Sequence, residues 1–171
     1  SLTYARFERE QPELQLTVVE LVPWLEQQAA ANRLLGRTLE VLVDTSRIPP
    51  HQCVELDCRS MPYAVSNLLR NAIKYARSRI CVSADIVNGR IDIHVDDDGI
   101  GIPPDERERV FSAFTRLDRS RDRGTGGYGL GLAIARLVLE QHGGTASAGD
   151  SPFGGARFTL SWPVSQNVTV S

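Results

Sequence analysis

The chain has 171 residues, 42% of them hydrophobic and 23% charged, with a formal net charge of -2, which is the usual composition of one globular domain. This slightly acidic balance argues against a protein that binds nucleic acid mainly through positive charge. No apolar run approaches the ~20 residues of a membrane-spanning helix, and residues 1–10 lack the basic start and apolar middle of a signal peptide.

The first predicted element is a helix within Leu14–Leu35, where apolar residues recur at helical spacing. Two strands are expected next, in the segments RTLEVLVD (37–44) and CVELD (53–57), on either side of a connection broken by prolines. A second helix is predicted at about Ser60–Ala76, because its apolar residues again recur at helical spacing.

The clearest local signal is a hairpin at residues 79–97. Asn88 and Gly89 suit the left-handed positions of a type I′ turn between its two strands. Alternation in the second strand places Ile91, Ile93 and Val95 on one face, and Asp92, His94 and Asp96 on the other.

The remaining elements are a short segment near residues 106–114, a helix after the glycine-rich residues 124–131, and closing strands at 144–149 and 155–163. Long helices between pairs of strands predict an α+β fold. We expect a two-layer α/β sandwich, in which helices cover one face of a mixed, mostly antiparallel sheet.

The second predicted helix has two different faces. Its apolar stripe consists of Met61, Val65, Leu68, Leu69 and Ala72. The opposite stripe carries Asn67, Asn71 and Lys74. A solvated helix face is one interpretation, but asparagine is a poor helix former, so two of them one turn apart favour a function. An amide oxygen is a suitable ligand for Mg²⁺, and a lysine can reach phosphates.

The segment DDDGIGI (96–102) ends the hairpin with carboxylates beside glycines. A carboxylate here can accept a hydrogen bond from an exocyclic amine, and Gly99 and Gly101 allow a flat ring to lie close to the backbone. A plain acidic turn is the alternative. A calcium loop does not fit, because its first ligand would be His94 and the segment follows a strand.

The third helix begins in a glycine-rich segment. Glycine lowers the stability of a helix, so its use here suggests that something approaches the backbone closely. Gly129 and Gly131 leave the unpaired N–H groups of the helix start open to an anion such as phosphate. A flexible loop before a core helix remains the alternative. Neither a P-loop nor a Rossmann glycine motif is present in the sequence.

Taken in order, four segments resemble the N box, first glycine box, F box and second glycine box of sensor histidine kinases. They are NLLRNAIKY, DDDGIGI, FSAFTRLD and GTGGYGLGLAIARLVLEQHGG, and the closing GGARFTLSWP resembles the third glycine region. The resemblance covers about Glu13–Pro163. It implies a Bergerat ATP-binding fold with three helices and a mobile lid. It also implies that residues 1–12 end a dimerisation helix, 13–163 form the catalytic domain and 164–171 form a tail.

The resemblance implies catalytic roles for Asn67, Asn71 and Lys74. Asn71 would coordinate Mg²⁺, Asn67 would support the same phosphate-side network, and Lys74 would meet the phosphates of ATP. Tyr75 would pack near the nucleotide, and Asp97 would accept a hydrogen bond from the adenine amine.

Further residues are implied at the nucleotide by the same resemblance. Those that shape the adenine pocket are Gly99, Gly101 and Ile102. Those that place the free helix N–H groups against the triphosphate are Gly127, Tyr128, Gly129, Leu130 and Gly131. Phe111 and Phe114 would anchor the lid at Thr115–Gly126, with Phe114 also at the nucleotide.

The implied activity is that of a protein-histidine kinase, with ATP and Mg²⁺ as cofactors. Hydrolysing relatives of this fold, such as DNA gyrase and MutL, carry a glutamate one turn before the magnesium asparagine, where this chain has Asn67. An amide cannot act as a general base, which favours a kinase over an ATPase. The alternative from another class is a nucleotide-binding regulatory module of the anti-sigma type.

The histidine that accepts phosphate in such kinases has no counterpart in the sequence. We expect structural roles for His51, His94 and His142, the last near a helix C-terminus whose dipole favours its charged form. Ala156 replaces a threonine common in relatives, so a side-chain contact to nucleotide is not expected there.

The implied partners are therefore a dimerisation domain bearing the acceptor histidine and a response regulator. Neither nucleic acid nor direct membrane contact is expected. The parent would be a homodimeric bacterial inner-membrane sensor, with this domain in the cytoplasm.

Overall fold

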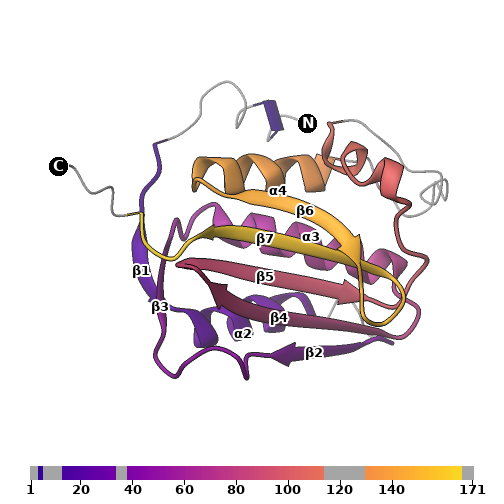
Figure 1. Ribbon diagram of the computed structural model, residues 1–171, viewed down its shortest axis with the longest axis horizontal. Coiled ribbons are helices and arrows are strands. Elements are labelled where there is room, and N and C mark those ends of the chain that lie inside the picture. The colour runs from indigo at the N-terminus through magenta and orange to yellow at the C-terminus, as the bar shows by residue number, and fades with distance from the viewer. Residues whose placement is uncertain (1–3, 6–12, 34–37, 114–129, 167–171) are drawn as a thin grey trace.

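The structure is a computed structural model that describes residues 4–5, 13–33, 38–113 and 130–166 (Figure 1). Helices α2, α3 and α4 form one layer, and a five-stranded sheet forms the other. The predicted α+β sandwich is confirmed. Tyr4 and Ala5, within the segment 1–12 that was expected to end a dimerisation helix, are also helical.

The beginning of the chain differs from the sequence prediction. Residues Thr17–Glu20 form a strand, β1, which pairs antiparallel with β3 (Cys53–Leu56), and α2 begins only at Leu21 and ends at Asn32. The prediction of helix across this segment was wrong because pairing with β3 holds the backbone extended, a conformation that β-branched Thr17, Val18 and Val19 readily adopt.

The main sheet has the order β2-β4-β5-β7-β6. Its strands are β2 (Glu40–Asp44), β4 (Arg79–Val87), β5 (Arg90–Asp97), β7 (Ala156–Pro163) and β6 (Thr145–Asp150). β2 runs parallel to β4, and every other pair is antiparallel, as predicted. The hairpin turn has the expected left-handed residues, Asn88 with φ 53° and Gly89 with φ 74°.

The core lies between the sheet and the helices α3 (Met61–Tyr75) and α4 (Leu130–Gln141). The predicted apolar stripe of α3 is buried there, as are Ile91, Ile93 and Val95 of β5. On the opposite face of β5, His94 and Asp96 are also buried, although that face is polar. Arg157 covers Asp96 with bonds of 2.8 and 2.9 Å, and His94 bonds Thr159 at 2.8 Å.

The connections complete the fold. Short 3₁₀ segments occupy Pro104–Glu106 and Arg109–Phe111 after β5. Residues 164–166, which belong to the expected tail at 164–171, run beside β3, where Glu55 N–H donates to the Val164 carbonyl at 2.9 Å. Within the described residues, no helix is both long and apolar enough to cross a membrane.

Candidate nucleotide-binding site

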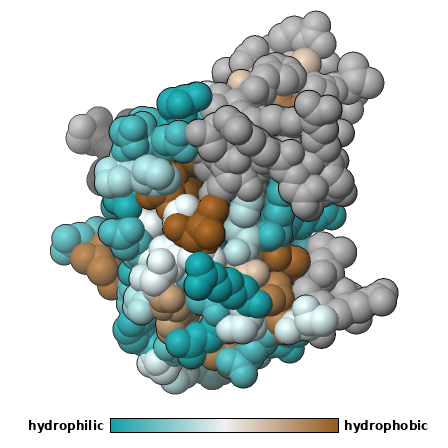
Figure 2. Space-filling model, turned by 90° about the vertical axis from the view of Figure 1, so that its right-hand side faces the viewer, coloured by the Kyte–Doolittle hydropathy of each residue, from teal (hydrophilic) through white to brown (hydrophobic). Residues whose placement is uncertain are grey.

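The end of β5, the polar face of α3 and the start of α4 meet toward the right of Figure 1. A Cβ on Gly99 would stand 2.2 Å from the carbonyl oxygen of Tyr75, and one on Gly131 would stand 3.2 Å from Asn67 Oδ1. The structure therefore brings together the motifs that the sequence singled out. Figure 2 shows this face, with apolar atoms near its middle and polar residues around them.

Asp97 is fully buried at the end of β5 and is held by backbone groups. Its Oδ1 accepts hydrogen bonds from Gly99 N–H at 2.9 Å and from Ala156 N–H at 3.1 Å. A Cβ on Gly155 would lie 2.2 Å from this oxygen and 2.5 Å from Gly99 N, so a larger residue does not fit there. The carboxylate is thus fixed in one orientation by the loop after β5 and by the start of β7.

The glycines after Asp97 serve the packing of the loop. Gly99 lies directly against the last carbonyl of α3, so the close approach it allows is that of Tyr75 and not only that of a ligand. Gly101 has φ +75°, which favours glycine. Ile102 is buried, and its carbonyl accepts from Arg107 Nε at 3.1 Å.

The neighbouring Asp98 has a different task. It accepts hydrogen bonds from Ser78 Oγ at 2.5 Å and from the N–H groups of Ser78 and Arg77 at 3.0 and 2.8 Å. The Ser78 hydroxyl, and then these N–H groups, hold the pKa of Asp98 well below its usual range. Asp98 therefore fixes the α3–β4 connection, and only the adjacent Asp97 lies buried at the site.

The phosphate-side residues lie on the half-buried face of α3. Asn67 packs against Gly131, where the absence of a side chain lets α4 approach α3. The Nδ2 atom of Asn71 is buried and has no hydrogen-bond partner among the described residues. Lys74 Nζ stands 5.3 Å from the centre of the Tyr75 ring. These side chains lie on one face of α3, and the buried Nδ2 of Asn71 is free to donate a hydrogen bond to a ligand.

The F-box segment packs firmly at its described end. Phe111 is buried, meets Phe158 edge to face at 6.0 Å, and lies 5.2 Å from the guanidinium of Arg136 on α4. The predicted lid and several predicted nucleotide contacts lie outside the described residues: Phe114, Thr115–Gly126, Gly127, Tyr128 and Gly129.

Each of the three histidines has structural contacts. His51 Nδ1 lies 2.7 Å from Glu20 Oε1, between β1 and β3. His94 bonds Thr159, and burial followed by the charge of Arg157 lowers its pKa.

The prediction of a charged His142 is wrong. The ring is fully buried, and its Nε2 accepts a hydrogen bond from Asp57 N–H at 3.0 Å while Nδ1 faces the Val138 carbonyl at 2.8 Å. An accepting nitrogen must be unprotonated, so the ring is neutral with its proton on Nδ1. Burial lowers the pKa of His142 and outweighs the nearby carbonyl and Asp57.

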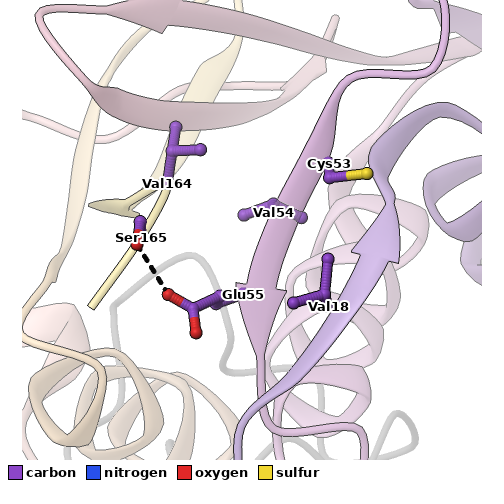
Figure 3. Close-up of a pocket in the computed structure, with 6 residues that line it drawn as sticks. All are labelled: Val18, Cys53, Val54, Glu55, Val164 and Ser165. Carbon is purple, nitrogen blue, oxygen red and sulfur yellow. Dashed lines mark hydrogen bonds between the residues drawn. The ribbon is translucent and has the colours of Figure 1, made fainter. Parts of the chain in front are cut away.

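Surface hollows in the described structure lie elsewhere. One, of about 310 Å³, lies beside β3 and the segment after β7 (Figure 3). It is lined by Val18, Cys53, Val54, Glu55, Val164 and Ser165. Another, of about 670 Å³, lies between α2 and β2. None of the predicted nucleotide residues lines either hollow.

The sequence did not reveal the contribution of the third glycine region. Gly155 and the Ala156 N–H orient Asp97, while the Ala156 side chain is buried. The sequence feature that could have indicated this role is the pair Gly154 and Gly155, directly before β7. These residues fit an adenine nucleotide. A fixed buried carboxylate lies at one end, and at the other lies the unsatisfied amide donor of Asn71, on the helix face whose Asn67 packs against the start of α4.

A family model described as histidine kinase-, DNA gyrase B- and HSP90-like ATPase matches residues 57–166. The chain belongs to this family. The sensor protein RstB of Escherichia coli strain K12 is 42% identical over 167 residues, which cover 98% of this chain and 38% of RstB. From residues 116–127 and 154–163 we expected a likeness to RstB-type kinases, and the identity to RstB confirms that likeness. The chain spans less than two fifths of this relative's length.

Solved structures give the same result. Full-length ShkA in complex with AMPPNP has a TM-score of 0.81 and 28% identity, over 95% of this chain and 34% of that one. The ATP-binding domain of PrrB from Mycobacterium tuberculosis has a TM-score of 0.71 and 29% identity, over 88% of this chain and 98% of that one. Within its family, the chain is therefore a domain of the sensor histidine kinase type.

Proposed function

We propose that this chain binds ATP with Mg²⁺ and donates the γ-phosphate to a histidine on a separate dimerisation domain, for relay to an aspartate of a response regulator. The observation that supports this most directly is the buried Asp97 carboxylate, fixed by Gly99 and Ala156 at one end of a site that α3 and α4 complete. The likeness to sensor kinases supports the same activity.

At the adenine end, the protein's role is recognition. Asp97 would accept a hydrogen bond from the exocyclic amine of adenine, because a carboxylate is an acceptor only. Its orientation is set before any ligand arrives, so little ordering is needed on binding. The same oxygen would find no amine on guanine at that position, which favours adenine.

At the phosphate end, the protein holds charge. The Asn71 side-chain oxygen would take one coordination position on Mg²⁺, and its buried Nδ2 would donate to a phosphate oxygen. Lys74 would neutralise phosphate charge, and the first turn of α4 from Leu130 would supply N–H groups. Bound Mg-ATP supplies the phosphoryl group that is transferred.

The side chain one turn before Asn71 is expected to set the reaction class. Asn67 stands one turn before Asn71, where an amide cannot remove a proton from water. Water attack should therefore be slow, and ATP should persist until a histidine is presented.

The partners and location belong to the same proposal. We place the domain in the cytoplasm as part of a homodimeric membrane sensor, with its dimerisation domain and response regulator as partners. The alternative of an anti-sigma-type regulatory module has no observation in its favour, and the sensor-kinase relatives count against it.

The test is phosphate transfer in trans. The chain is mixed with γ-labelled ATP, Mg²⁺ and the isolated dimerisation domain of a sensor kinase such as RstB. We expect label on that domain, stable to alkali and labile to acid, and none when its acceptor histidine is replaced by alanine. Brisk release of inorganic phosphate with no transfer to any histidine domain would mean that the chain is an ATPase.

A further inference from the structure

Asp57, which directly follows β3, is hydrogen-bonded to the segment Glu13–Gln15. Its Oδ2 accepts from Gln15 N–H at 2.9 Å and from Arg59 Nη2 at 3.0 Å, and its Oδ1 accepts from Arg59 N–H at 2.8 Å. Arg59 Nη2 also donates to the Glu13 carbonyl at 3.0 Å. The segment Glu13–Gln15 is thus tied to the start of α3 by a carboxylate that is only 3% exposed.

The backbone of Asp57 contacts the C-terminal end of α4. The Asp57 N–H donates to His142 Nε2, and His142 directly follows α4. The Nδ1 atom of the ring binds back to Val138 within α4, so the imidazole bridges the helix end and the β3–α3 connection. This contact joins residues 85 positions apart in the sequence.

The segment after β7 closes around this contact. Gln166 Nε2 donates to the His142 carbonyl at 2.6 Å, and Gln166 N–H donates to Glu55 Oε1 at 2.7 Å. Glu55 also accepts from Ser165 Oγ at 2.8 Å, as Figure 3 shows. The Trp162 ring meets the imidazole edge to face at 6.4 Å. His142 therefore has little room to move independently of β3.

Helix α4 extends from this contact to the candidate site. Its 12 residues span about 18 Å, and its first turn packs on Asn67 through Gly131. Arg136 in its middle contacts Phe111 and Glu108. A rigid helix fixed at its C-terminal end transmits a displacement there to its N-terminal end.

We propose that Asp57 and His142 form a joint that couples the segment Glu13–Gln15 to α4, with His142 as a positioning residue for the phosphate end of the site. Its functional meaning rests on the proposed function, in which a dimerisation domain is a partner of this domain. A movement of that partner that displaces Glu13–Gln15 would then reach the first turn of α4 through two side chains.

The joint has a second arrangement that protonation selects. A proton on Nε2 would face the Asp57 N–H, donor against donor, and break the bridge. The charged group that faces the ring is the Asp57 carboxylate, whose partner is Arg59, while Trp162 and Gln166 present uncharged groups. A charged ring would compete for that carboxylate with Gln15 and Arg59.

The test is amide hydrogen exchange on the full chain without nucleotide. His142→Phe removes the acceptor of the Asp57 N–H but leaves the Gln15 bond in place. We expect exchange at the Gln15 amide to rise about 10-fold relative to a core amide such as that of Ile93. His94→Phe is the matched control, since it removes another buried histidine that has no bond to this joint, and His142→Gln should restore part of the protection because its amide oxygen can accept.

The reciprocal variant is Arg59→Gln, which frees Glu13 and leaves the Asp57–His142 bond intact. It should raise exchange in the first turns of α4, at residues 132–135. The joint does not exist if His142→Phe affects Gln15 no more than His94→Phe does, or if Arg59→Gln leaves α4 unchanged.

The wild-type chain tests the proposed joint even if a variant fails to fold. On acidification, Gln15 exchange, corrected for its intrinsic pH dependence, should rise with the same midpoint as the ring ¹⁵N shifts of His142. A rise with any other midpoint, or no rise, contradicts the proposal. Neither measurement uses nucleotide or phosphotransfer, so failure of the joint and failure of the kinase proposal are distinguishable.

Discussion

The two ends of the candidate site are built in different ways. At the adenine end, the functional group is a buried side chain fixed by backbone N–H groups of a loop and a strand, and a neighbouring glycine leaves no spare space. At the phosphate end, half-buried side chains project from one helix, and one of them has a buried donor that no described residue satisfies. The first end is held in one geometry by the backbone, whereas the second is formed by side chains on the face of a single helix.

This difference shows where changes should harm folding and where they should harm only binding. Backbone hydrogen bonds in a sheet cannot adjust to a new side chain without moving a strand. Side chains on a helix face can be replaced while the helix stays in place. The adenine end should therefore show the larger effects, and stability and affinity should fall together there.

The largest effect is expected for Gly155→Ala. The new Cβ would lie 2.2 Å from Asp97 Oδ1 and 2.5 Å from Gly99 N, so the loop or β5 must move. We expect a loss of about 3 kcal/mol in the free energy of unfolding, with loss of ATP binding. Chemical denaturation and calorimetry measure the two. Gly149→Ala is the control, because a Cβ there meets nothing within 4 Å; equal stability of the two variants would contradict the described packing.

Asp97→Asn should separate recognition from folding at the same end. The amide oxygen can still accept from Gly99 and Ala156, but its NH₂ would face the adenine amine, donor against donor. We expect about 10- to 100-fold weaker ATP binding with little change in stability. Calorimetry is the measurement, and Asp98→Asn is the control of equal charge change. Unchanged affinity in Asp97→Asn would remove the adenine assignment.

Much of this site was predictable from the sequence, for local reasons. The α3 stripe follows helical spacing, the hairpin follows from Asn88-Gly89, and Asp97 stands out by its neighbouring glycines. The carboxylate's partner Ala156 was not predictable, because that contact depends on which strand pairs with β5 and in which register.

Misassignments arose where distant contacts outweighed local pattern. The Thr17–Glu20 strand exists because it pairs with β3, yet its apolar residues continue the spacing of the following helix. His142 follows a helix whose dipole favours charge, but burial and the Asp57 N–H impose the neutral ring. Neither partner lies near in the sequence.

Acid should lower the free energy of unfolding, because two of the groups that connect the elements around the site titrate at low pH. Burial lowers the pKa of His142, so the unfolded chain takes up that proton first as the pH falls below about 6.5. Burial raises the pKa of Asp57, but bonds from Arg59 and Gln15 outweigh it and bring the pKa from 3.8 to about 2. The stability that Asp57 supplies, about 2 kcal/mol, is complete above pH 3.8 and is lost toward pH 2.

Urea unfolding from pH 7 to about pH 2 measures this dependence. The free energy of unfolding should fall in two steps, the first belonging to the buried histidines and the second to the carboxylates with lowered pKa, Asp57 and Asp98. Asp57→Asn should reduce the second step by about 2 kcal/mol while leaving the first. A free energy that stays constant over this range would show that neither contact forms as described.

The smallest and most selective effect is expected for Gly131→Ala at the phosphate end. Alanine should stabilise the first turn of α4 by up to about 1 kcal/mol, but its Cβ would stand 3.2 Å from Asn67 Oδ1 and 3.3 Å from Asn67 Cγ, so that side chain must shift by a few tenths of an ångström. The gain and the crowding should nearly cancel in stability. Mg-ATP affinity should fall a few-fold, about 1 kcal/mol at most, because the displaced amide would border the phosphates in the proposed complex. The double-mutant cycle with Asn67→Ala isolates the cause, since truncating Asn67 removes the crowding and should abolish the affinity loss caused by Gly131→Ala. If the loss persists in the Asn67→Ala background, Gly131 acts through the backbone of α4 and not through its contact with Asn67.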